Sequence, residues 1–410
     1  MPASATTASS APATREPAIR QQERPGSGGA HIAVFGVPMP GHINPTLAVV
    51  EELVARGHRV SYAMTDEFAP LVKSVGAEPV VYPDAVPGEH QTAENVNRHL
   101  SLSLVQTAHA LGPLAAAYAD DRPDLVLHDV LAWSGLMLAR QWKVPSVLSS
   151  PTHLPYEGVI PEMFGVADIY DIEGIPEVEP ALAHYGITAT AREVAFSHER
   201  AVAYFPSVFQ RRLETVAVKS AAFVGPVIGD RSFQGSWQPP ADGRPVLFVS
   251  LGTVCVWPPE FFRACVDAFA DLPWHTVVSV GRSLDPLSLG PLPDNMEVHA
   301  SVPQLRVLAH ARAFVTHAGM GGTMEAAHHG VPMVAIPQTA EQQVNADQIE
   351  KLNLGVHLPP GRLSPRALRE AVLHVASSPV IARGITAMRR HLDETGGATA
   401  AADALESHLP

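Results

Sequence analysis

The sequence predicts an α/β fold in which two Rossmann-like, doubly wound domains face a central cleft. Its 410 residues are too many for one ordinary core and suggest two domains. Short apolar segments alternate with helical ones from residue 31, and the alternation restarts after a stretch rich in Pro and Gly, residues 223–244. Such alternation is typical of parallel sheets, which bind ligands beyond the carboxyl ends of their strands.

The first half, residues 31–222, begins with a predicted strand at 31–37. Asn44 fits the N-cap of the next helix, Pro45 its first position and Gly57 its end. Further strands are predicted at 58–64, 78–83, 123–129 and 144–150, and helical stretches at 92–119 and 134–142. Residues 151–210 do not show this alternation of strands and helices and are predicted to be irregular or helical.

The second half repeats the pattern, with predicted strands at 245–252, 275–281, 295–300, 313–319 and 331–337. We expect a second domain at residues 245–385, helices at 386–410 and a linker at 223–244. Residues 1–30 are rich in Ala, Pro, Ser and Thr and lack aromatic residues, which predicts a disordered extension. Their arginines leave an organelle transit peptide as the lesser alternative.

The composition narrows the classes of function. A formal net charge of -13 disfavours a nucleic-acid partner, because such proteins usually present a basic surface. Cys255 and Cys265 are the only cysteines, so no disulfide framework is expected and a cytoplasmic location fits. No apolar run is long enough to span a bilayer, so we expect no membrane partner.

A glycine-rich loop in the second half is the strongest local signal for a ligand. The segment "HAGMGGT" runs from His317, at the end of a predicted strand, to Thr323, after which a helix is predicted to follow. Glycines let the backbone approach a ligand, and free N–H groups at a helix start attract anions, so a diphosphate is the predicted guest. A second strand end, residues 250–253, could face the same anion. The alternative is a tight strand-to-helix turn that binds nothing.

The segment "FGVPMPGHINP", residues 35–45, has the glycine spacing of a phosphate loop but carries His42 in place of lysine. His42 follows the first predicted strand and should lie at the mouth of the cleft. A neutral imidazole accepts a proton near pH 7, and Asp129, at another strand end, could orient it. With 20 histidines present, ordinary packing is the alternative for His42. For Asp129 the alternative is an N-cap, for which Ser134 competes, and His128 should point to the opposite face of its strand.

The segment from His317 to Gln348 resembles the donor-binding signature of the inverting nucleotide-sugar glycosyltransferases. Over residues 31–405 the chain is similar to the actinomycete macrolide glycosyltransferases, which glucosylate and inactivate antibiotics. The resemblance is carried by the phrases "ELVARGHRVSYA" (52–63), "AYADDRPDLVLHD" (117–129), "FVGP" (223–226), "SLGT" (250–253), "LPDNMEVH" (292–299) and "VPQLRVL" (302–308). It implies a GT-B fold and a UDP-dependent hexosyltransferase that modifies a macrolide hydroxyl.

The resemblance also implies which residues bind the sugar donor. The glycine loop would hold the diphosphate, Glu325 the ribose hydroxyls and Gln304 the base, while Glu341 and Gln342 would contact a glucose-type sugar. A polar helix start is the alternative for this last pair. The implied donor-binding set is Ser250, Gly252, Thr253, Ser301, Val302, Gln304, His317, Gly319, Gly321, Gly322, Thr323, Glu325, Glu341 and Gln342. Ser301 departs from the family, which usually has there a tryptophan that stacks on uracil.

In the family the histidine of "GH-x-NP" is the general base, so the resemblance assigns that role to His42 with Asp129 as its partner. The implied reaction is one in-line displacement with UDP-glucose as co-substrate, no tightly bound cofactor and, because the chain has no Asp-x-Asp triplet, no metal. The residues expected to shape a pocket for a bulky apolar acceptor are Trp133, residues 85–110 and the segment 151–166, which has bulky apolar side chains and includes Pro151, Tyr156 and Met163, with loop packing as the alternative. The last helix would brace the first domain, and we expect a monomer or homodimer.

Two other functions stay open on the sequence. A nucleotide-sugar 2-epimerase would share the fold but would not need an acceptor region as long as 151–210. A non-catalytic auxiliary partner of another glycosyltransferase would share the fold too, but it would need no base at His42 or Asp129.

Overall fold

The computed structural model describes residues 29–85, 99–172, 175–252, 257–281 and 284–410. Several predictions made from the sequence lie outside these ranges. They concern most of the N-terminal extension, Thr253, Cys255 and the start of the helical stretch predicted at 92–119.

The first half contains a parallel sheet of seven strands in the order β3-β2-β1-β4-β5-β6-β7. The strands are β1 His31–Phe35, β2 Arg59–Met64, β3 Glu78–Val81, β4 Leu125–Asp129, β5 Ser146–Ser150, β6 Arg200–Ala203 and β7 Ser220–Phe223. The helices are α1 Pro40–Ala55, α2 Ala69–Ser74, α3 His99–Ala117, α4 Trp133–Trp142, α5 Val159–Phe164, α6 Val178–His184 and α7 Ala191–Phe196. The central strands are buried along their whole length, as the apolar runs predict.

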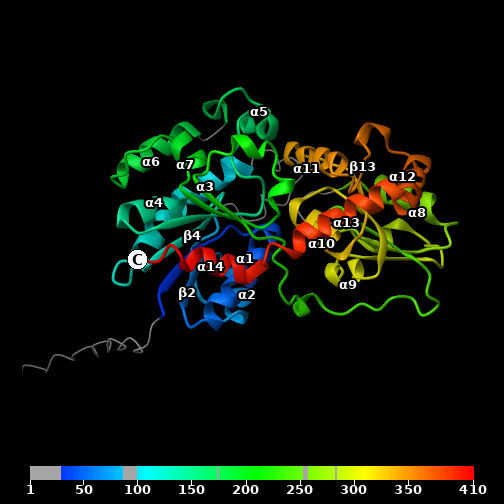
Figure 1. Ribbon diagram of the computed structural model, residues 1–410, viewed down its shortest axis with the longest axis horizontal. Coiled ribbons are helices and arrows are strands. Elements are labelled where there is room, and N and C mark those ends of the chain that lie inside the picture. Colours follow the sequence, from blue (N-terminus) through cyan, green and yellow to red (C-terminus); the bar gives the residue numbers. More distant parts are fainter. Residues whose placement is uncertain (1–28, 86–98, 173–174, 253–256, 282–283) are drawn as a thin grey trace, which may run out of the picture.

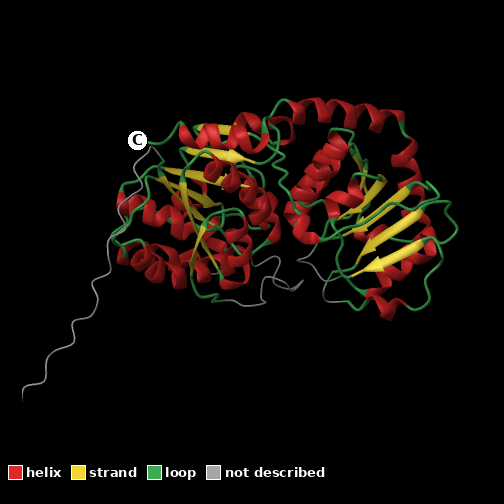
Figure 2. Cartoon of the chain, turned by 90° about the horizontal axis from the view of Figure 1, so that it is seen from below, coloured by secondary structure: helices red, strands yellow, loops and turns green. Residues whose placement is uncertain are grey.

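The second half contains a parallel sheet of six strands in the order β10-β9-β8-β11-β12-β13. The strands are β8 Val246–Ser250, β9 His275–Ser279, β10 Met296–His299, β11 Ala311–Thr316, β12 Met333–Ala335 and β13 Gly355–His357. The helices are α8 Pro259–Phe269, α9 Gln304–Leu308, α10 Met320–His329, α11 Ala340–Lys351, α12 Pro365–Ser377, α13 Pro379–Asp393 and α14 Gly397–Glu406. Figure 2 shows helices on both faces of each sheet, so the predicted fold class is confirmed.

Three strands were not predicted. The region expected to be irregular or helical, residues 151–210, contains β6, and β7 and β13 follow in later segments. The sequences of β6 and β7, "RAVA" and "SAAF", consist mostly of small residues, and β13 is only three residues long. None of these segments shows the β-branched run that identifies a strand, so their pairing depends on the sheet edge that they extend.

Two helices begin earlier than predicted, so that candidate site residues lie in their first turns and not before them. Helix α1 starts at Pro40, not at Pro45, because proline is tolerated in the first turn, where N–H groups have no partner within the helix. His42 therefore lies in the first turn of α1 and not before it. Helix α10 starts at Met320, and the N–H of Thr323 already donates to the carbonyl of Gly319 at 3.0 Å.

The C-terminal helices run from the second half back to the first. Figure 1 shows α13 over the second half and α14 beside α1. Arg56, at the end of α1, donates to Asp403 at 2.6 Å and to Glu406 at 2.7 Å, and His58 lies 2.9 Å from Glu406. Helix α14 is thereby tied to the first half by charged groups as well as by its buried apolar face.

Within the described part of the chain, no single helix is both long and apolar enough to cross a membrane. The pair α12 and α13 meets those criteria only when both are counted together across a 62° bend. No group of three or more His, Cys, Asp or Glu side chains that could hold a metal ion occurs among the residues described.

Buried histidines predict that acid weakens this fold. Burial lowers the pKa of His128 and His153 from 6.5 to about 3 and that of His198 to about 4. Below pH 6.5 the unfolded chain binds these protons and the folded chain does not, so the free energy of unfolding falls from pH 6.5 towards pH 4. The loss is at most about 1.4 kcal/mol per histidine and pH unit.

Urea unfolding between pH 7 and pH 4.5 measures this slope. The variant His198→Asn, which removes one of these groups, should show a shallower slope than the parent protein. An equal slope in both proteins would mean that the buried histidines do not cause the loss.

Candidate active site

Two side chains from the first half meet at the point where the strand order reverses. His42 follows β1 and Asp129 ends β4, and these neighbouring strands carry helices to opposite sides of the sheet. Nδ1 of His42 lies 3.0 Å from Oδ1 and 2.9 Å from Oδ2 of Asp129, although 87 residues separate them in the chain. The predicted His–Asp contact is therefore present.

The surroundings of Asp129 show that it does not cap a helix. Its Oδ1 accepts the N–H of Leu131 at 2.9 Å, and its side chain is almost fully buried. Helix α4 starts at Trp133 with Ala132 as its N-cap, so Ser134 lies inside the helix and caps nothing. His128 points into the core, as predicted from the alternation of side chains along a strand.

The electrostatics of the pair favour a basic imidazole. Burial on its own would lower the pKa of His42, but the charge and hydrogen bond of Asp129, together with the charge of Glu341, raise it above its ordinary value. The carboxylate holds the proton of the neutral ring on Nδ1, which leaves Nε2 free to accept another. Because 19% of the His42 side chain is exposed, a substrate can reach the ring.

The first turn of α11 brings the second half to the same place. Oε1 of Glu341 accepts the hydroxyl of Thr152, in the loop after β5, at 2.8 Å. Thr339 caps α11 through the N–H of Gln342, whose own Oε1 accepts the N–H of Gln338 at 2.8 Å. The polar helix start proposed as an alternative thus explains part of this sequence. Glu341 is different, because it crosses to the first half and lies close enough to act on His42.

The glycine loop forms the N-terminus of helix α10. Gly319 is the N-cap of α10, and Gly321 and Gly322 lie in its first turn, where N–H groups have no partner within the helix. His317 packs between two glycines, since a Cβ on Gly252 or Gly319 would collide with its ring. Burial lowers the pKa of His317 to about 4, so the ring is neutral. Its buried Nδ1 has no partner within the described part of the chain.

The other predicted donor residues surround this loop. Ser250 ends β8, Ser301 and Val302 lie between β10 and α9, and Gln304 begins α9. The hydroxyl of Thr323 is fully buried and finds no hydrogen-bond partner in the described ranges. Glu325, on α10, is also buried, and its carboxylate is held by Gln304 and by an arginine of the interdomain segment, Arg231.

The four predicted acceptor residues are packed more deeply than expected. Trp133 is 2% exposed and its indole N–H donates to the carbonyl of Val130 at 2.9 Å. Tyr156 is 3% exposed and donates to Glu162, Pro151 is buried and Met163 is half-buried. Trp133 and Tyr156 belong to the core of the first half, and Met163 packs against it. None of the four lines the hollow described next.

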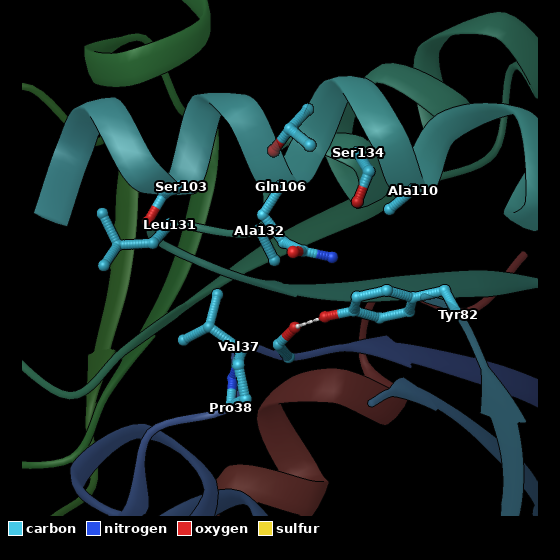
Figure 3. Close-up of a pocket in the computed structure, with 11 residues that line it drawn as sticks. Val37, Pro38, Tyr82, Ser103, Gln106, Ala110, Leu131, Ala132 and Ser134 are labelled. Carbon is cyan, nitrogen blue, oxygen red and sulfur yellow. Dashed lines mark hydrogen bonds between the residues drawn. The ribbon is translucent and has the colours of Figure 1, made fainter. Parts of the chain in front are cut away.

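A small hollow does lie at the ends of β1 and β4 (Figure 3). Its lining residues are Gly36, Val37, Pro38, Tyr82, Ser103, Gln106, Thr107, Ala110, Leu131, Ala132 and Ser134. The hydroxyl of Tyr82 donates to the carbonyl of Gly36 at 3.0 Å and closes one wall. Because Leu131 binds the carboxylate of Asp129, the hollow adjoins the His42–Asp129 pair. Part of the predicted acceptor region 85–110 lines it, whereas residues 86–98 lie outside the described residues.

Two contacts in this region were missed by sequence reasoning. Thr152 lies in a segment singled out only for its bulky apolar residues, and Arg231 lies in the aperiodic linker. Neither residue belongs to a recognisable motif. Their partners, Glu341 and Glu325, lie on distant helices of the second half, so local sequence carries no signal for them.

Comparison with known proteins identifies the family. A family model described as the C-terminal domain of erythromycin biosynthesis protein CIII-like matches residues 264–399. Over 398 residues the chain is 39% identical to the oleandomycin glycosyltransferase of Streptomyces antibioticus, covering 93% of this chain and 91% of that protein. The chain belongs to the macrolide glycosyltransferase family.

Two further matches agree with this assignment. The demethyllactenocin mycarosyltransferase of Streptomyces fradiae is 38% identical over 407 residues, which cover 93% of this glycosyltransferase and 87% of that protein. The crystal structure of the glycotransferase of kitacinnamycin matches with a TM-score of 0.84 and 38% identity, covering 93% of this chain and 99% of the other. The resemblance and the GT-B fold are thus confirmed. One relative is named for a mycarosyl group, so family membership alone does not decide the sugar.

Proposed function

We propose that this enzyme transfers glucose from UDP-glucose to a hydroxyl of a bulky, apolar macrolide, with inversion at the anomeric carbon. The observation that carries the proposal is the His42–Asp129 pair, whose imidazole has a raised pKa and an accessible edge beside Glu341 of the other half. The acceptor would lie against the first half, over the hollow next to Asp129.

The reaction is one displacement. Nε2 of His42 takes the proton of the acceptor hydroxyl while the acceptor oxygen forms its bond to the anomeric carbon. The bond from that carbon to the diphosphate breaks, and UDP leaves with the electron pair. The first turn of α10 and the N–H of neutral His317 stabilise the charge that develops on the diphosphate. Asp129 stabilises the imidazolium formed on His42.

Donor choice rests on charged and polar groups of the second half. Glu325 and Gln304 form the nucleoside end of the site, and Glu341, held by Thr152, forms the sugar end. A carboxylate accepts hydrogen bonds from sugar hydroxyls, which supports a fully hydroxylated hexose over a deoxysugar. In this proposal the enzyme uses a cytoplasmic nucleotide sugar without a tightly bound cofactor, and acts as a monomer or homodimer.

The test is an incubation of the purified protein alone with UDP-glucose and a panel of macrolides, followed by mass spectrometry. Addition of one hexose to a macrolide supports the proposal, and a β-linkage in the NMR spectrum of the product supports inversion. A product that appears only when a second glycosyltransferase is added would support an auxiliary partner instead. A parallel incubation with UDP-GlcNAc and no acceptor tests epimerisation; formation of the 2-epimer would overturn the proposed transfer.

A further inference from the structure

One arginine of the linker between the two halves reaches into the second half. Arg231 directly precedes a short turn of helix at Ser232–Gln234, in the segment that Figure 1 shows in green beneath the second sheet. Its Nη1 donates to Oε1 of Glu325 at 2.6 Å, across 94 residues of sequence. The side chains of Arg231 and Glu325 are only 10% and 7% exposed. An ion pair this deeply buried is costly to form, so its two partners depend on each other.

A second donor fixes the same carboxylate. Nε2 of Gln304 donates to Oε2 of Glu325 at 2.5 Å. Each carboxylate oxygen accepts about two hydrogen bonds, and Arg231 and Gln304 use one on each oxygen. One acceptor position therefore remains on each oxygen of Glu325. Two neighbouring acceptor positions on one planar group match the two hydroxyls of a vicinal diol.

The arginine also balances charge where an anion would bind. Glu325 lies on α10, the helix whose first turn carries Gly321 and Gly322 of the diphosphate loop. Without Arg231, a buried carboxylate would stand close to a negatively charged ligand and repel it. The Nε of Arg231 is buried and has no partner among the residues that the structure describes, so the guanidinium keeps one further donor for an incoming oxygen.

We propose that Arg231 is a positioning residue for the donor nucleoside: it orients the carboxylate of Glu325 so that its two free acceptor positions receive the ribose diol. This inference rests on the proposed function, because it takes a ribonucleoside diphosphate as the donor. It adds a residue from the linker to a site built otherwise from the second half. The linker thereby contributes to donor affinity and does more than join the two halves.

The test uses Arg231→Met, which keeps the apolar stem and removes the charge, and Arg231→Lys, which keeps the charge and removes the planar fork. Arg244→Met is the matched control, because Arg244 lies in the same linker and pairs with Asp242 beside it, at 2.6 Å, away from Glu325. Calorimetry measures the Kd of UDP, 2′-deoxy-UDP and 3′-deoxy-UDP for each protein. Steady-state kinetics measure KM for the donor and kcat at saturating donor.

In the parent protein UDP should bind more tightly than both deoxy forms. In Arg231→Met the affinity for UDP should fall by about 10- to 100-fold and the preference for UDP should shrink to about threefold or less, because a charged hydrogen-bond network has lost one member. The donor KM should rise in step while kcat stays within about threefold, since the reacting atoms keep their partners. Arg231→Lys should lie between the two, and Arg244→Met should match the parent.

An Arg231→Met variant that folds and keeps the parent's preference for UDP overturns the inference. A fall in kcat without a rise in KM does so as well. If Arg231→Met does not fold, Arg231→Lys decides, and a preference equal to the parent's overturns the inference. The binding data also separate this inference from the proposed function. If the parent protein prefers UDP over its deoxy forms but transfers no sugar, only the proposed transfer is contradicted. If the parent protein transfers sugar, and both Arg231 variants keep the parent's preference for UDP, only the role of Arg231 is contradicted.

Discussion

Replacing His42 with alanine is expected to lower kcat for glycosyl transfer by about 10²- to 10⁴-fold, the usual contribution of a general base. The variant loses the Nε2 that takes the acceptor proton. UDP affinity should stay within about threefold of the parent value, because the groups that would hold the nucleotide lie in the second half and the linker and do not include His42. Product formation by mass spectrometry and UDP binding by calorimetry measure the two effects separately.

His391→Ala is the matched control for this variant. His391 is an exposed histidine of α13, far in sequence from both glycine loops, so its loss should leave transfer and binding unchanged. A His42→Ala protein that loses UDP binding along with transfer would contradict the assigned role, because the imidazole would then serve the donor or the fold.

Replacing Asp129 with asparagine is expected to lower kcat by about 10²- to 10⁴-fold, because the orienting charge behind the base is lost. An amide offers one acceptor oxygen, which must serve both Nδ1 of His42 and the N–H of Leu131. The pKa of His42 is raised by Asp129, so it should fall in the variant. Since His42 must be neutral to act, the acid limb of the kcat/KM profile should move to lower pH, and a pH series between 5 and 9 measures it.

Asp120→Asn removes an exposed carboxylate of the same domain and should leave the profile unchanged. An Asp129→Asn protein that loses rate but keeps its acid limb at the same pH would contradict the role assigned to the pair. The limb would then report a group other than His42.

The fold was predictable because the buried strands of a doubly wound sheet appear in the sequence as short runs of apolar residues. The central strands, such as β1 and β4, are mostly apolar and are buried along their whole length, and each was predicted within a few residues. The edge strands β7 and β13 were missed because neither contains a recognisable apolar run: β7 consists mostly of small residues, and β13 is only three residues long. Both helix starts were misplaced because the chain around Pro40 and Gly319 enters the helix sooner than cap residues suggest.

The site was predictable where it depends on strand ends and not where it depends on contacts between the halves. Parallel strands end at one edge of a sheet, so His42 and Asp129 could be placed together from sequence position alone. The contact of Thr152 with Glu341, and that of Arg231 with Glu325, depend on how an aperiodic loop or linker packs against a distant helix. Neither the periodicity of apolar residues nor the spacing of motifs in the sequence predicts that packing. The predicted acceptor residues do not line the hollow, and their role stays a prediction, because large apolar side chains such as Trp133 serve the core as readily as a pocket.

The central claim is that His42 removes a proton from the acceptor as the sugar transfers. The most direct measurement compares the parent protein and His42→Ala over a series of acceptors of falling pKa, from an alcohol through substituted phenols to nitrophenols, at one pH. An acceptor that is already ionised needs no base, so the ratio of the two rates should fall from about 10²–10⁴ for the alcohol towards one for the most acidic phenol. A ratio that stays constant along the series would contradict the claim.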